Sequence, residues 1–323
     1  MIKILNIEAK NCFPEVKAAL SSFAEITDME AKDGTELRKY VGEFDVILTR
    51  VSNKIDKELL EQAGSLKVIV TNTTGLDHID LEAAKELNIS VLSLKGETEF
   101  LKTISATAEL TWGLLLALQR KLYSAFNDVL EGNWRRDLFI GGELSGKILG
   151  VIGYGRLGKM VASYGRTFNM KVCAYDPYQS DHDVRWVSFD ELLDESDVVT
   201  LHVPLNDETK KMMNKERLFS MKKGALLINT SRGEIIDEEG LLDALENEHL
   251  GGAALDVMVG EDKFRSGERG WPVKDSLVKY AASHTNLIIT PHIGGMSNDS
   301  IRKTDLFMVK RLKEFLIKEG LLQ

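Results

Sequence analysis

Apolar and polar residues alternate along the first hundred positions in a pattern that predicts strands and helices in turn. Short runs typical of buried strands lie at Ile2–Ile7, Phe44–Leu48, Leu66–Val70 and Ser90–Leu94. Helical patterns separate them at Leu59–Ala63 and Leu81–Leu87, and Pro14 opens an earlier helix, where its missing N–H does no harm. This alternation predicts a parallel sheet covered by helices on both faces.

The longest helical pattern covers residues 103–130. Almost every face of it is apolar between Leu114 and Leu118, so we predict a helix buried between domains or between subunits. Trp112 and Trp134 flank this segment. We expect both to pack in a core, with a dimer contact as the alternative.

A second series of strands begins at Ile148–Ile152, which leads directly into Gly-x-Gly-x-x-Gly at Gly153, Gly155 and Gly158. An amphipathic helical pattern follows. The first glycine permits a tight turn, the second lets a pyrophosphate approach the backbone, and the third lets helix and strand pack closely. The phosphates would lie at the positive end of the helix. The motif therefore predicts a dinucleotide site.

An acidic residue supports this interpretation. The next strand, Lys171–Tyr175, ends at Asp176, 18 residues after Gly158. A carboxylate at that point accepts hydrogen bonds from the ribose hydroxyls of the adenosine. The same carboxylate would repel a 2′-phosphate, so Asp176 favours NAD over NADP.

Four further strands complete this series, each followed by polar residues or by Gly and Pro. They are predicted at Asp197–Leu201, Leu226–Ile228, Ala253–Leu255 and Leu287–Ile289. The six strands make one nucleotide-binding sheet, and ligands bind such sheets beyond the carboxyl ends of the strands.

Three side chains at this edge suit acid–base chemistry. Arg232 could hold a carboxylate through two parallel hydrogen bonds. His292 can exchange a proton near neutral pH, and Glu261 could accept the other imidazole N–H and favour the charged ring. Singly, each residue is also compatible with a surface charge or a turn. Another histidine, His202, is expected to form a wall of the cofactor site.

Two loops of the first region also follow strands. Thr71–Asp77 could present backbone N–H groups to a carboxylate, with Gly75 permitting unusual backbone angles; an ordinary turn capped by Thr and Asp is the alternative. Arg50 follows another strand, where a solvated charge is the alternative to a ligand.

Bulk composition excludes several classes. The chain has 323 residues, enough for about two domains, with 43% hydrophobic and 28% charged residues. A net charge of −9 argues against nucleic acid and anionic membrane surfaces as partners. Cys12 and Cys173 lack metal-ligand spacing, so we predict no metal site and a reduced, cytoplasmic protein. No signal peptide or membrane span is expected.

Seven motifs carry a resemblance that covers essentially the whole chain. They lie at residues 73–80, 153–158, 175–177, 202–205, 229–233, 254–257 and 291–295. With these motifs the chain closely resembles the NAD-dependent D-isomer-specific 2-hydroxyacid dehydrogenases.

The resemblance implies an α/β architecture in which a Rossmann dinucleotide-binding domain is inserted into a flavodoxin-like substrate-binding domain. The implied boundaries are residues 1–102 plus 297–323 for the substrate-binding domain and 103–296 for the NAD-binding domain. An apolar stripe of Met308, Leu312, Phe315 and Leu316 agrees with a C-terminal helix that completes the first domain. The family is typically dimeric, so a homodimer is expected.

Residue by residue, the resemblance implies Arg232, Glu261 and His292 as catalytic residues. It implies Arg50, Thr74 and Gly75, with Arg232 and His292, as substrate-binding residues. The implied cofactor-binding residues are Thr74, Thr107, Gly153, Tyr154, Gly155, Arg156, Leu157, Gly158, Asp176, Val203, Pro204, Thr230, Ser231, Arg232, Asp256, His292 and Gly294.

The predicted activity is interconversion of a D-2-hydroxy acid and its 2-oxo acid with NAD(H). Alternatives are a phosphoglycerate- or phosphite-type dehydrogenase of the same fold, or an NAD(H)-sensing corepressor-like protein. One departure is the interval from Glu261 to His292, which is longer than expected and contains residues 263–272. These residues could cover the substrate, extend a dimer contact or form a solvated loop. The sequence leaves the particular acid and the physiological direction open.

Overall fold

The structure is a computed structural model that describes residues 1–29, 34–51, 53–179, 182–261 and 275–322. These residues form two compact units. Unit 1 contains residues 1–104 and 296–322, and unit 2 contains residues 105–261 and 275–295. Both units are α/β, as the alternating pattern predicted.

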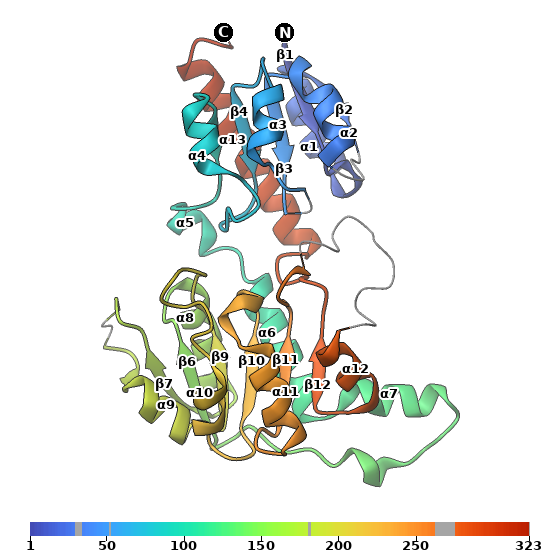
Figure 1. The fold of residues 1–323 in the computed structure, drawn as a ribbon, viewed down its shortest axis with the longest axis vertical. Helices are drawn as coiled ribbons and strands as arrows, with labels where there is room; N and C mark the ends of the chain where they lie inside the picture. The colour runs from blue at the N-terminus through green and yellow to red at the C-terminus, as the bar shows by residue number, and fades with distance from the viewer. Residues whose placement is uncertain (30–33, 52, 180–181, 262–274, 323) are drawn as a thin grey trace. The chain divides into compact units, whose positions relative to one another are not determined.

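Unit 1 has a five-stranded parallel sheet in the order β2-β1-β3-β4-β5, a flavodoxin-like order (Figure 1). Its strands are β1 (Ile2–Asn6), β2 (Ala24–Asp28), β3 (Val46–Thr49), β4 (Val68–Thr71) and β5 (Ser90–Leu92). Its α-helices are α1 (Pro14–Ser21), α2 (Gly34–Tyr40), α3 (Lys57–Gln62), α4 (Leu81–Glu86), α5 (Thr98–Leu101) and α13 (Asn298–Lys318). Strand β2 was not predicted, because it is a short edge strand in which only Ala24 is buried and three of the five residues are polar.

The two faces of this sheet bury different helices. Because side chains alternate along a strand, Leu5 of β1 packs with α2, α3 and α4, whereas Ile4 packs with α1 and α13. The C-terminal helix places Leu312 and Leu316 in this second core, where both are fully buried. The C-terminal residues therefore complete the core of unit 1, although most of that unit comes from the start of the chain.

Unit 2 has a seven-stranded parallel sheet in the order β12-β11-β10-β9-β6-β7-β8, the doubly wound order of dinucleotide-binding folds. Its strands are β6 (Ile148–Ile152), β7 (Lys171–Tyr175), β8 (Arg185–Trp186), β9 (Val198–Leu201), β10 (Leu226–Asn229), β11 (Gly252–Leu255) and β12 (Leu287–Ile289). Helices α6 (Ala106–Gln119) and α8 (Arg156–Thr167) cover one face. The other face carries α9 (Phe189–Glu195), α10 (Lys215–Ser220), α11 (Glu238–Glu246) and α12 (Ser276–Ser283). All six predicted strands are present, and β8 adds a short edge.

The predicted long helix is two helices. Lys121 has a φ of 51° and ends α6, so that α7 (Leu122–Leu130) starts in a new direction. Trp112 lies in the core as predicted, but the expectation of core packing for Trp134 is wrong, because 83% of its surface is exposed. The alternative of a dimer contact for Trp134 stays a prediction. We call residues 122–140 the α7 arm, whose exposed apolar side chains are Leu122, Tyr123, Phe126, Val129, Leu130, Trp134, Leu138 and Ile140.

No helix in the described part of the chain is both long and apolar enough to cross a membrane.

Candidate active site

The glycine motif of unit 2 forms the turn between β6 and α8. Gly153 has a φ of 88°, and a Cβ at this residue would lie 2.5 Å from the carbonyl oxygen of His202. A Cβ at Gly158 would lie 2.1 Å from the carbonyl oxygen of Gly153. A Cβ at Gly155, by contrast, would meet no atom within 4 Å. Two glycines are thus required by packing, and the open space at the third suits a pyrophosphate at the start of α8.

Asp176 lies beside this turn at the end of β7. Its Oδ2 accepts a hydrogen bond from the Tyr154 N–H at 2.8 Å, and its Oδ1 accepts one from the Tyr178 N–H at 2.9 Å. Arg156 and Leu157 open α8 directly after the turn. The carboxylate is therefore held next to the glycine turn, which is where a residue that binds the adenosine ribose has to lie.

Strand β9, which pairs with β6, and strand β10, which pairs with β9, present further expected cofactor residues at their carboxyl ends. Val203 and Pro204 follow β9, while Thr230 and Ser231 follow β10. The Thr230 hydroxyl lies 2.9 Å from that of Thr111 on α6, the helix that also carries Thr107. These positions share the carboxyl edge of one sheet.

His202, at the end of β9, suits the predicted wall role. Its Nε2 lies 2.9 Å from the Thr200 hydroxyl. Burial lowers the pKa of His202 to about 4, so its imidazole is neutral at physiological pH. Such a ring would be a poor proton donor.

Arg232 is held by a buried asparagine. The Asn229 amide donates a hydrogen bond to the carbonyl oxygen of Arg232 at 2.8 Å, and its Oδ1 accepts one from the Ser231 N–H at 2.9 Å. A Cβ at Gly233 would lie 2.2 Å from the Met258 carbonyl carbon. The loop after β10 therefore packs directly against the loop that leads to Glu261. Sequence reasoning missed this support, although a polar residue ending a buried central strand was a usable signal.

The imidazole of His292 contacts the carboxylate of Glu261, which lies 31 residues earlier in the chain. Nδ1 of His292 and Oε1 of Glu261 are hydrogen-bonded. Oε2 of Glu261 accepts a second hydrogen bond from the Met258 N–H at 3.1 Å. The side chains of His292 and Glu261 are 25% and 22% exposed. The contact fixes the ring orientation and leaves Nε2 as the atom suited to proton exchange.

Asp256, at the end of β11, organises the loop that carries His292. Its carboxylate accepts hydrogen bonds from the Thr290 hydroxyl at 2.6 Å and from the N–H groups of Ile293 and Gly294 at 2.9 and 2.7 Å. Its carbonyl oxygen accepts one from the His292 N–H at 2.8 Å. Burial raises the pKa of Asp256, and the hydrogen-bond donors oppose this rise. His292 itself has a φ of 54°, a conformation that non-glycine residues seldom adopt.

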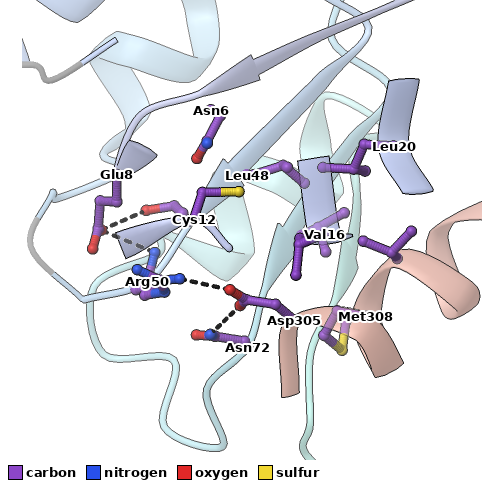
Figure 2. Close-up of a pocket in the computed structure, with 13 residues that line it drawn as sticks. Asn6, Glu8, Cys12, Val16, Leu20, Leu48, Arg50, Asn72, Asp305 and Met308 are labelled. Carbon is purple, nitrogen blue, oxygen red and sulfur yellow. Dashed lines mark hydrogen bonds and ion pairs between the residues drawn. The ribbon is translucent and has the colours of Figure 1, made fainter. Parts of the chain in front are cut away.

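In unit 1, Arg50 is buried in an ion pair. The guanidinium Nη2 lies 2.7 Å from Oδ2 of Asp305 on α13, and each side chain is 12% exposed. The amide of Asn72, which follows β4, donates to Oδ1 of Asp305 at 2.6 Å (Figure 2). Burial raises the pKa of Asp305, while Arg50 and Asn72 lower it. The alternative of a solvated Arg50 is therefore wrong, and the sequence pattern gave no signal for Asp305.

The turn predicted to bind a carboxylate follows the same strand, β4. The Thr73 hydroxyl donates to the carbonyl oxygen of Gly75 at 2.8 Å, and Thr74 is exposed between them. The candidate residues thus gather at the carboxyl ends of the strands in each unit. Residues 263–272 lie outside the described residues.

Comparison with known proteins adds independent evidence. The family model described as D-isomer specific 2-hydroxyacid dehydrogenase, NAD binding domain, matches residues 112–294. The hydroxypyruvate reductase of Thermotoga maritima is 36% identical over 279 residues, which cover 86% of each chain. The D-3-phosphoglycerate dehydrogenase of Bacillus subtilis is 35% identical over 285 residues, but this chain spans only 50% of its length.

Comparison with solved structures supports the same family. The structure of D-lactate dehydrogenase from Aquifex aeolicus, complexed with NAD and lactic acid, matches with a TM-score of 0.83 and 32% identity, covering 99% of this chain and 96% of that one.

Proposed function

Because the chain belongs to the D-isomer specific 2-hydroxyacid dehydrogenases, which are NAD-dependent enzymes, we propose that Arg232, Glu261 and His292 are its catalytic residues. The reaction would interconvert a D-2-hydroxy acid and its 2-oxo acid. The observation that carries this proposal is the contact between His292 and Glu261, which lies on the same sheet edge as the glycine turn.

Each catalytic side chain has a distinct task. Arg232 carries a permanent charge and binds the substrate carboxylate through paired hydrogen bonds. When bound, the nicotinamide supplies the hydride that reaches the carbonyl carbon. His292 donates the proton from Nε2 to the carbonyl oxygen, and Glu261 stabilises the charged imidazole before that transfer. In the reverse direction His292 accepts the hydroxyl proton.

The residues present fit the cofactor. The open space at Gly155 would receive the pyrophosphate, and Asp176 would bind the adenosine ribose. We further propose that Arg50, Thr74 and Gly75 bind substrate.

The α7 arm supports a homodimer. Its apolar side chains Tyr123, Phe126, Leu130 and Trp134 are 67%, 64%, 70% and 83% exposed. An apolar surface of this kind is typical of a protein–protein contact, and we propose a second copy of the chain as the partner. A cytoplasmic location stays a prediction.

The test is NADH oxidation with a panel of 2-oxo acids, using the wild type, His292→Gln and His284→Gln. His284 is exposed and serves as the matched control. His292→Gln should lower kcat by roughly 10²- to 10⁴-fold while NADH binding persists. Turnover by His292→Gln near that of the wild type would disprove the assignment. Tight NADH binding by a wild type that reduces no member of the panel would favour a sensor.

A further inference from the structure

Unit 1 contains a small cavity of about 50 Å³ at the carboxyl edge of its sheet (Figure 2). Glu8 follows β1, Arg50 follows β3, and these strands are neighbours that are not consecutive in sequence. The cavity therefore lies at the point where the strand order reverses, and parallel α/β sheets bind ligands at such points. Its apolar wall consists of Val16, Leu20, Leu48, Val70, Met308 and Val309.

The polar rim of this cavity carries more acidic than basic side chains. Asp305 pairs with Arg50 and also accepts the amide hydrogen bond of Asn72. A second carboxylate, Glu8, accepts a hydrogen bond from the backbone N–H of Arg50 at 2.9 Å. The three groups that are charged at neutral pH, Glu8, Arg50 and Asp305, carry a formal charge of −1 together.

One residue on the rim of this cavity lies close in sequence to the turn that is proposed to bind substrate. Asn72 on its rim lies two residues before Thr74, and both follow β4. A substrate held by the turn would therefore have its remaining atoms near the end of the same strand.

We propose that this cavity receives the side chain of the substrate, and that Asp305 makes it select a short, uncharged side chain ending in a hydroxyl over one ending in a phosphate. The inference rests on the proposed function, because it concerns the substrate of that reaction.

Two physical arguments support the choice. A hydroxyl both donates and accepts, so it can donate to a carboxylate of the rim and accept from Arg50 or Asn72. A phosphate carries about two negative charges and would be repelled by Glu8 and Asp305, and Asp305 already engages the arginine that would otherwise bind it. The size of the cavity also favours a short side chain, because a volume of about 50 Å³ holds only a few water-sized groups.

The experiment compares three substrates with NADH: hydroxypyruvate, pyruvate and phosphohydroxypyruvate. For the wild type, kcat/KM for hydroxypyruvate should exceed that for each of the other two by about tenfold or more. Asp305→Asn keeps the shape of the side chain but removes its charge. It should move the ratio between phosphohydroxypyruvate and hydroxypyruvate by about tenfold toward the phosphorylated substrate, mainly through KM. Asp299→Asn, an exposed position on the same helix, should leave the ratio unchanged.

The outcomes separate the two proposals. A wild type that oxidises no NADH with any 2-oxo acid would overturn the proposed function and this inference with it. A wild type that is active but prefers the phosphorylated substrate, or treats pyruvate and hydroxypyruvate alike, would overturn the inference alone. So would a folded Asp305→Asn variant with the wild-type ratio. If that variant fails to fold, the wild-type ratios still decide the question.

Discussion

Replacing Asp256 by asparagine tests how the loop that carries His292 is held. The carboxylate accepts three hydrogen bonds from this loop and is almost fully buried. An asparagine keeps one oxygen but places an NH₂ group against N–H or O–H donors, so at least one buried donor loses its acceptor.

The magnitude follows from these contacts. An unsatisfied buried donor costs about 1–3 kcal/mol, and the remaining hydrogen bonds lose the strength that the charge gave them. Part of this loss is offset, because asparagine carries no charge and avoids the cost of burying one. Burial raises the pKa of Asp256, which shows that this cost exists in the wild type. We expect the free energy of unfolding to fall by about 2–4 kcal/mol. Because a displacement of about 1 Å at a catalytic group can cost roughly 10²-fold, kcat should fall by about 10- to 100-fold.

The assay is urea unfolding together with steady-state kinetics on Asp256→Asn, Thr290→Val and Asp207→Asn. Thr290→Val removes one of the three donors and should cost about 1 kcal/mol. Asp207 is exposed and serves as the control. Wild-type stability and kcat in Asp256→Asn would show that the carboxylate does not hold the loop that carries His292. An effect confined to KM for NADH would instead indicate that Asp256 acts through the cofactor.

Three further predictions concern other parts of unit 2. In Gly233→Ala the added methyl group would collide with backbone atoms. This variant should lose more unfolding free energy and more kcat than Gly260→Ala, where a Cβ would meet no atom within 4 Å but the positive φ disfavours alanine. Equal losses in the two variants would contradict the packing argument. Burial raises the pKa of Glu238 from 4.5 to about 7, so its folded-state proton stabilises the protein at low pH, and this contribution is lost as pH rises through about 7. The free energy of unfolding of Glu238→Gln should therefore rise relative to that of the wild type by about 1–3 kcal/mol between pH 5 and 8. The exposed Glu239→Gln variant should show no such trend. A difference between Glu238→Gln and the wild type that does not change with pH would contradict this prediction. The double variant Phe126→Ser and Leu130→Ser should shift the protein toward monomer in sedimentation, and an unchanged mass would argue against the α7 arm as the dimer contact.

The strands of both sheets could largely be predicted because their apolar runs are short and bounded by polar or glycine residues. Helix boundaries were harder. Nothing in the pattern near Lys121 signalled its positive φ, so two helices were predicted as one. Trp134 was expected in a core because aromatic residues usually pack there, and its exposure on the α7 arm depends on the path of that segment.

Local spacing along the chain was enough to predict the α/β class, the glycine turn with Asp176, and the residue types at the strand ends. The contact of His292 with Glu261, 31 positions earlier, was predicted from the sequence and is present in the fold. Two other contacts became visible only in three dimensions: Gly233 with the Met258 backbone and Arg50 with Asp305, which lie 25 and 255 positions apart. Such contacts arise when parallel strands bring their carboxyl ends to one edge and when the last helix returns to the first sheet. Neither periodicity nor motif spacing encodes the partner of a buried charge.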